Sequence, residues 1–162
     1  MHFGLIRILF HSAALLMFVT ACAHGADDSP KAGGDEARTA EVKKLVETYF
    51  RSWSNREMDA YGECFLPGAS IQFISPSGEL DTQSMREFLA NQRRYQMARP
   101  AKETPQSIDI RFEKRLARAV VYWKLDDGSG TPKYGYDHFT LVQRDGNWRI
   151  VNLAFYESDA PR

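Results

Sequence analysis

Three polar side chains near the C-terminus, Asp137, Asn152 and Tyr156, are of types that can transfer protons to and from a small organic molecule. A carboxyl group in apolar surroundings has a raised pKa because burial disfavours its charged form, and it can then act as a general base or as a hydrogen-bond-donating acid. Asp137 is therefore the candidate catalytic residue. Tyr156 or Tyr61 could polarise a carbonyl group, while Asn152 orients a substrate. The alternative is that Asp137 points to water or pairs with an arginine.

The dipeptide Asp145-Gly146 predicts which side chains near Asp137 share a face. It joins two alternating segments, which indicates a hairpin with a two-residue turn. The predicted pairs are Arg144 with Asn147, Gln143 with Trp148, Leu141 with Ile150, Phe139 with Asn152, and Asp137 with Ala154. One face then carries Trp148, Ile150, Leu141, Phe139, Asn152, Asp137 and Tyr156, and the other carries Val142, Thr140, Val151, His138, Leu153, Tyr136 and Phe155. Both faces are apolar, so we expect one to pack under helices and the other to meet a partner subunit.

His138 and Cys64 are the other candidates for chemistry in the folded part of the chain. His138 could carry protons, but the predicted register places it on the face opposite Asp137, where a histidine satisfied in an interface is the commoner case. Cys64 lies in an apolar helical pattern, and buried thiols usually behave as small hydrophobic residues, so we expect a core residue rather than a reactive one. With one histidine and no cysteine pair in this part of the chain, we expect no protein-built metal site and no cofactor.

Residues 39–158 must supply the elements that position these side chains, and they are predicted to form one α+β domain. A first helix starting near Thr39 presents one apolar stripe, made of Val42, Leu45, Val46, Tyr49, Phe50 and Trp53. Asn55 is the predicted N-cap of a short second helix, and Ser84 with Glu87 forms the capping box of a third. Alternation predicts strands over 69–75, 107–113, 117–125, 134–144 and 147–156. The helices should pack on one side of a curved, mainly antiparallel sheet.

Three segments of the domain are similar to the nuclear transport factor 2-like superfamily, which includes SnoaL-like cyclases, ketosteroid isomerase and scytalone dehydratase. They are Tyr49-Phe50-Arg51-Ser52-Trp53 at the end of the first helix, Phe65-Leu66-Pro67-Gly68-Ala69, and the closing hairpin from Phe139 to Val151. The resemblance spans about residues 40 to 157. It implies a cone in which helices close over a concave sheet and leave an apolar cavity. Because many activities share this fold, the resemblance says little about function.

The resemblance also implies where the candidate residues lie. It turns the face that carries Trp148 inward and makes the face that carries Val151 a homodimer contact. Asp137, Asn152 and Tyr156 then line or rim the cavity. The expected wall residues from the helices are Tyr49, Trp53 and Tyr61.

The first 21 residues have the layout of a secretory signal, because one charged residue, Arg7, precedes an apolar run from Ile8 to Val19 and then small residues. The run of about 12 residues is too short to cross a bilayer, which needs about 20. Val19-Thr20-Ala21-Cys22 resembles a bacterial lipobox, so Cys22 is the predicted site of cleavage and lipid attachment. The alternative is ordinary cleavage at the small-x-small site Ala21-Cys22-Ala23.

The remaining segments predict a membrane-tethered protein of the cell envelope. Residues 22–38 comprise the lipidated cysteine and a flexible tether rich in Ala, Gly, Asp and Ser, and residues 159–162 form a tail. Ala23, in place of Asp, resembles the signal for transfer to an outer membrane, with the domain facing the periplasm. The chain has 21 basic and 21 acidic residues. Without the basic patch that nucleic acids need, no nucleic-acid partner is expected.

Three functions follow from this sequence. The leading hypothesis is a lipid-anchored module that binds a small, mostly apolar molecule. The second is an isomerase, dehydratase or cyclase with Asp137 as general base. The third is a structural dimer that docks on another envelope protein.

Overall fold

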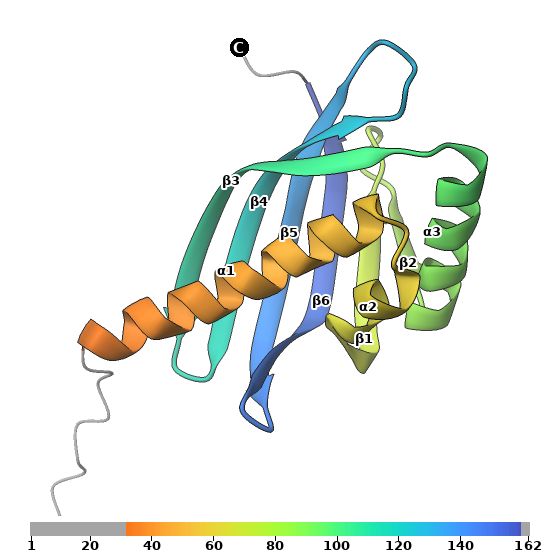
Figure 1. Cartoon of the computed structure of the whole chain (residues 1–162). Helices are drawn as coiled ribbons and strands as arrows, with labels where there is room; N and C mark the ends of the chain where they lie inside the picture. Colours follow the sequence, from red (N-terminus) through yellow and green to blue (C-terminus); the bar gives the residue numbers. More distant parts are fainter. Residues whose placement is uncertain (1–31, 160–162) are drawn as a thin grey trace, which may run out of the picture.

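A curved six-stranded sheet forms one layer of the domain, and three helices lie against one side of it (Figure 1). The computed structural model describes residues 32–159, so the predicted signal sequence and Cys22 lie outside the described residues. The helices are α1 (Ala32–Ser54), α2 (Met58–Glu63) and α3 (Met85–Ala98). The strands are β1 (Phe65–Ile74), β2 (Leu80–Gln83), β3 (Lys102–Glu113), β4 (Leu116–Asp126), β5 (Lys133–Arg144) and β6 (Asn147–Ser158). The predicted α+β class is confirmed.

The strands lie in the order β2-β1-β6-β5-β4-β3. All neighbours are antiparallel except β1 and β6, which are parallel. The prediction missed the short edge strand β2, and it began β3 at Ser107 rather than at Lys102. The earlier part of β3 contains Pro105, where the pairing with β4 shifts. A proline is tolerated there because β3 is an edge strand, where the missing N–H need not interrupt the ladder.

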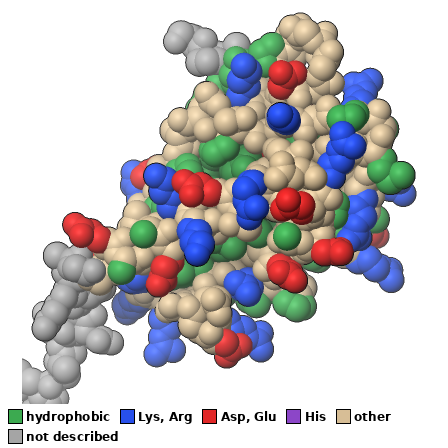
Figure 2. Space-filling view, in the orientation of Figure 1, with side chains coloured by type: hydrophobic (Ala, Val, Ile, Leu, Met, Phe, Trp, Pro, Cys, Tyr) green, Lys and Arg blue, Asp and Glu red, His purple; other side chains and the backbone are tan. Residues whose placement is uncertain are grey.

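Helix α1 buries the apolar stripe that the sequence predicted. Val42 and Val46 are fully buried, and Tyr49, Phe50 and Trp53 are at most 5% exposed. Figure 2 shows acidic and basic side chains scattered over the outward face of α1, as expected of an amphipathic helix. Within residues 32–159, no helix is both long and apolar enough to span a membrane.

The start of α1 corrects the prediction, since the helix begins at Ala32 and not near Thr39, and so takes up part of the expected tether. Arg38 stabilises the added turns. Its Nη1 contacts Asp35 Oδ1 at 3.0 Å, and its Nη2 donates to the carbonyl oxygen of Lys114 at 2.8 Å. The guanidinium also lies 4.2 Å from the ring centre of Phe112. These tertiary contacts outweigh the local preference of glycine and aspartate for a loop.

The predicted helix caps have mixed outcomes. The capping box of α3 is confirmed, because Ser84 Oγ accepts from the backbone N–H of Glu87 and Glu87 Oε2 accepts from the N–H of Ser84. Asn55 was predicted to cap α2, and this is wrong. The N-cap is Glu57, and Asn55 donates a side-chain hydrogen bond to Glu57 Oε1 at 3.3 Å.

The register of the β5–β6 hairpin is confirmed near the turn and wrong beyond it. Leu141 pairs with Ile150 as expected, but the next pair is Thr140 with Asn152, so Val151 is an extra residue in β6. Such a β-bulge exchanges the two faces of the strand that follows it. Phe139 therefore pairs with Leu153, and Asp137 pairs with Phe155. The predicted pairs Phe139 with Asn152 and Asp137 with Ala154 do not form.

Gln96 joins the ends of α1, α3 and β3 inside the protein. This side chain is 1% exposed. Its Nε2 donates to the carbonyl oxygens of Trp53 at 3.1 Å and Ala101 at 3.3 Å, and its Oε1 accepts from the N–H of Ala101 at 3.2 Å. It thereby pairs one backbone group at the end of α1 and two at Ala101, just before β3 begins.

The substitution Gln96→Leu should lower the free energy of unfolding by about 2–4 kcal/mol, because each buried polar group left unpaired costs about 1–3 kcal/mol. Urea unfolding of the full chain measures the change. Met97→Ala is the matched control, since Met97 is 83% exposed on the same helix and its loss should change stability by less than about 0.5 kcal/mol. Equal unfolding midpoints for the two variants would contradict the assigned role of Gln96.

Candidate functional site

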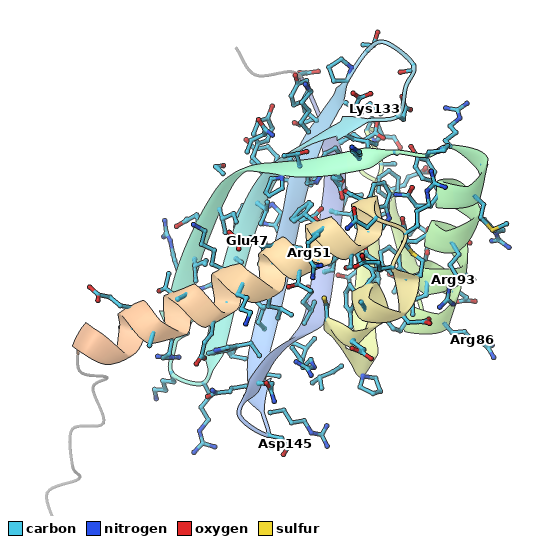
Figure 3. All side chains as sticks on the ribbon, in the orientation of Figure 1. Glu47, Arg51, Arg86, Arg93, Lys133 and Asp145 are labelled. Atoms are coloured by element: carbon cyan, nitrogen blue, oxygen red, sulfur yellow. The ribbon has the colours of Figure 1, made fainter. Side chains whose placement is uncertain are left out.

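A cavity of about 280 Å³ lies between the helices and the sheet, at the end of the molecule where β5 begins. Lys133, the first residue of β5 and labelled in Figure 3, stands at its mouth. Eight of the fifteen lining residues are aromatic. The lining consists of Tyr49, Trp53, Tyr61, Phe73, Phe88, Asn91, Gln92, Tyr95, Glu103, Trp123, Leu125, Lys133, Asp137, Phe155 and Glu157. An apolar wall with a few polar groups is the usual composition of a small-molecule site.

Asp137 is a buried polar residue in the lining of this cavity. The residue is 2% exposed. Its Oδ1 accepts a hydrogen bond from Trp123 Nε1 at 2.9 Å, while Oδ2 is buried and has no hydrogen-bond partner within the described residues. Burial raises the pKa of Asp137 to about 7. The Trp123 indole and the nearby Tyr49 hydroxyl have the opposite effect and lower this pKa. The carboxyl group can therefore exist in either protonation state at neutral pH.

Gly135 explains how Trp123 reaches Asp137. The two residues are partners in the β4–β5 ladder, and a Cβ on Gly135 would collide with the Trp123 ring and with the carbonyl oxygen of Tyr156. The indole therefore lies over the glycine, and its N–H points to the carboxyl group two residues further along β5. Sequence reasoning missed Trp123. The available signal was a tryptophan opposite a glycine, which marks a close approach.

Glu103 is the second carboxyl group in the cavity, and sequence reasoning also missed it. It lies near the start of β3, where Ser54 Oγ donates to its carbonyl oxygen at 3.1 Å and accepts from its N–H at 3.0 Å. Part of the residue is accessible through the cavity. Burial raises the pKa of Glu103 well above its usual value, and the charge of Asp137 raises it further. Because the expected strand began at Ser107, Glu103 was left in an unassigned loop.

The three wall residues expected from the helices do line the cavity. The rings of Tyr49 and Tyr61 lie 4.7 Å apart between centroids. Burial is the main cause that raises the pKa of both hydroxyl groups, so both stay protonated at neutral pH. Trp53 Nε1 donates to Gln92 Oε1 at 2.7 Å, which ties α1 to α3 at the mouth. Their part in ligand binding stays a prediction.

Three other candidates lie away from the cavity, which corrects their expected position. Trp148 is buried near the hairpin turn, where Nε1 donates to Glu41 Oε2 at 3.1 Å. The bulge at Val151 turns Asn152 and Tyr156 to the outer face of the sheet. There Asn152 Nδ2 donates to Gln72 Oε1 at 2.8 Å, and Tyr156 has its ring 5.5 Å from that of Tyr136. Tyr156 therefore cannot act with Asp137, and the tyrosines that line its cavity are Tyr49, Tyr61 and Tyr95.

His138 and Cys64 are also outside the site. The His138 ring stacks on Tyr156 at 5.7 Å, on the outer face of the sheet. Cys64 is 2% exposed, and burial raises the pKa of its thiol to about 11, so it is a core residue and not a nucleophile. Within residues 32–159, no group of three or more His, Cys, Asp and Glu side chains is arranged to hold a metal ion.

Comparison with known proteins identifies the family. The model of the family described as "Putative lumazine-binding" matches residues 37–156, which include every lining residue of the cavity except Glu157. The chain belongs to this lumazine-binding family. None of the curated proteins is similar enough in sequence to count as a relative.

Several solved structures have a fold similar to that of this chain. A protein of unknown function from Mycobacterium tuberculosis has a TM-score of 0.70 at 10% identity, covering 81% of this chain and 78% of its own. An NTF-2 like protein of unknown function from Silicibacter pomeroyi has a TM-score of 0.59 at 22% identity, covering 76% and 98%. A protein named "Putative Scytalone Dehydratase" from Novosphingobium aromaticivorans has a TM-score of 0.64 at 12% identity, covering 77% and 87%. The predicted nuclear transport factor 2-like fold is confirmed.

The substitution Gly135→Ala should destabilise the protein by about 1–3 kcal/mol and displace the Trp123 indole, because the added Cβ meets a ring and a backbone oxygen that cannot both move aside. Urea unfolding measures the first effect, and a red shift of tryptophan fluorescence reports the second. Gly34→Ala is the control, since nothing lies within 4 Å of that added Cβ on α1 and alanine favours a helix. A Gly135 variant as stable as the Gly34 variant would refute the close approach.

The raised pKa of Asp137 predicts how stability depends on pH. The folded protein holds this proton up to about pH 7, whereas an unfolded aspartate loses it near 4, so stability should fall as pH rises between these values, by as much as about 4 kcal/mol. Urea unfolding of Asp137→Asn from pH 4 to pH 8 should show a shallower fall, with the remainder due to Glu103. Asp109→Asn, on an exposed part of β3, should keep the wild-type dependence. An unchanged slope in Asp137→Asn would contradict the assignment.

Proposed function

We propose that this protein is a lipid-anchored module of the cell envelope whose cavity binds a small, mostly apolar molecule. The observation that carries the proposal is the buried Oδ2 atom of Asp137, which has no hydrogen-bond partner among the residues that the structure describes and belongs to a residue that lines an aromatic cavity. A buried polar atom without a partner destabilises a protein by about 1–3 kcal/mol. A ligand with one suitable donor group would recover that loss when it binds.

The size and composition of the cavity favour a compact, flat ligand. Its volume of about 280 Å³ lies near the lower end of small-molecule pockets, which begin at about 300 Å³. Tyr49, Tyr61 and Trp123 present ring surfaces around Asp137, and flat molecules gain most from contact with such rings. A bicyclic lumazine, the ligand in the family description, is a molecule of this shape.

The location and oligomeric state are part of the proposal. The apolar run from Ile8 to Val19 and the lipobox-like segment that ends at Cys22 support export, lipid attachment and an outer-membrane position facing the periplasm. An aromatic cluster on the outer face of the sheet supports a homodimer, because Tyr122, Tyr134, Tyr136, His138 and Tyr156 form a chain of ring contacts there. These half-buried rings would be covered by a second copy of the same face.

A second candidate function is acid–base catalysis by Asp137. The specific observation in its favour is the pKa of about 7, which suits a group that takes up and returns a proton near neutral pH. The buried, protonated hydroxyl groups of Tyr49 and Tyr61 could polarise a carbonyl group of a substrate in the same cavity. The reaction would then be an isomerisation, dehydration or cyclisation.

Mass spectrometry of the full-length protein, extracted from membranes in mild detergent, tests the proposal. We expect a chain that begins at a diacylated Cys22, a dimer under native conditions, and a small molecule released on denaturation. Asn91→Trp, at the cavity mouth, should lose most of that molecule. Ala90→Trp, on the exposed side of the same helix, is the matched control.

Each readout can fail separately. Equal ligand content in the two tryptophan variants, or an empty wild-type protein, would contradict binding in the cavity. An unmodified chain that begins beyond Cys22 would remove the anchor. Turnover of the released molecule by the wild type but not by Asp137→Asn would favour the enzyme.

A further inference from the structure

The cavity has an excess of carboxyl groups over basic groups. Asp137, Glu103 and Glu157 line it, and Lys133 is the one basic residue among its described lining residues. Lys133 lies at the mouth, where its Nζ is 3.5 Å from Glu157 Oε1. Within the described part of the chain, neither Asp137 nor Glu103 forms a salt bridge. Among the described residues, Asp137 and Glu103 therefore line the cavity without a cationic partner.

Asp137 has one carboxylate oxygen that can still accept a hydrogen bond from a ligand. The Trp123 indole already occupies Oδ1, and Oδ2 remains without a partner. The titratable groups whose pKa responds to the charge of Asp137 come from three elements, namely Tyr49 on α1, Tyr61 on α2 and Glu103 on β3. None of these three carries a positive charge, so a cationic ligand would meet no competing cation among them.

The walls add a second attraction for a positive charge. The cavity is lined by the aromatic rings of Tyr49, Tyr61 and Trp123. The faces of such rings attract a cation that has left water. An anion would meet two carboxyl groups and the negative ring faces. A neutral alcohol would satisfy Oδ2 but would leave the carboxyl pair without a counter-charge.

We propose that the ligand carries a protonated amine, which donates N–H groups to Asp137 and Glu103 while its apolar body lies against the aromatic walls. This inference rests on the proposed binding function and specifies the chemical class of the ligand. Binding converts the acid pair to its charged form, so a proton is released as the complex forms. The amine is recognised by charge, and the rest of the molecule by shape.

Two probes with the same ring system, 1-naphthylmethylamine and 1-naphthalenemethanol, test the charge directly. Isothermal titration of the full-length protein in detergent at pH 8 should show the amine binding about tenfold more tightly than the alcohol. The preference should shrink towards about pH 6, because Asp137, with a pKa of about 7, takes up a proton there while the amine stays charged. The affinity for the alcohol should stay constant.

Variants locate the recognition. Asp137→Asn and Glu103→Gln should each remove most of the preference for the amine while keeping the affinity for the alcohol, which shows that the cavity remains folded. Asp109→Asn, on the exposed side of β3, is the matched control and should keep the full preference.

The outcomes separate this inference from the proposed function. Equal affinity for the two probes would overturn the amine assignment and leave the cavity as a binding site for neutral molecules. A preference for the amine that survives both substitutions would also overturn it. Binding of neither probe, together with an empty protein from membranes, would overturn the proposed function as well.

Discussion

The burial of one carboxyl group, that of Asp137, is the constraint around which the cavity is arranged. A carboxyl group out of water must be hydrogen-bonded or must hold its proton. The Trp123 indole donates to Oδ1 and the nearby Tyr49 hydroxyl also favours the charged form, while Oδ2 has no hydrogen-bond partner among the described residues. The large indole fits only because Gly135 faces it across the ladder. The β-bulge at Val151 then brings Phe155 to the same side, so one more aromatic residue covers the acid.

The helices contribute to the same arrangement through buried polar contacts. Ser54 binds both backbone groups of Glu103, and Gln96 holds the end of α1 to the chain that leads into β3. These bonds fix the early part of an edge strand, which would otherwise be the most mobile part of a sheet. The carboxyl group of Glu103 is thus held near Asp137 by side chains far from it in sequence. These links connect the end of α1 to the start of β3, beside the cavity.

Much of the fold could be predicted from local patterns, whereas the site depended on long-range ones. The stripe of α1, the capping box at Ser84 and the turn at Asp145-Gly146 each depend on residues close in sequence, and all three are confirmed. The bulge at Val151 could not be predicted from the sequence. Both faces of β6 are apolar, so either register agrees with the pattern of apolar residues. Tyr156 was consequently placed inside and Phe155 outside.

The missed residues have a common physical cause. Trp123 and Glu103 act through partners on other strands and helices, Gly135 and Ser54, so no local spacing reveals them. The added turns of α1 were missed for the same reason, because Arg38 stabilises them by contacts with Phe112 and Lys114. Propensity alone predicts a loop there, and tertiary packing overrides it.

The group formed by Asp137, Trp123 and Gly135 argues for function on energetic grounds. A buried acid is less favourable than a well-packed apolar residue of similar volume, and a glycine inside a strand weakens that strand. A leucine at position 137 would need neither the indole donor nor the space over the glycine. Three residues that are neighbours in space therefore depart from what stability alone favours. The acid of Asp137 needs the Trp123 donor, and the Trp123 ring needs the space over Gly135. Departures from local preference that support one another are typical of functional sites. Their joint result is a buried carboxyl group that lines an aromatic cavity and has one oxygen without a hydrogen-bond partner among the described residues.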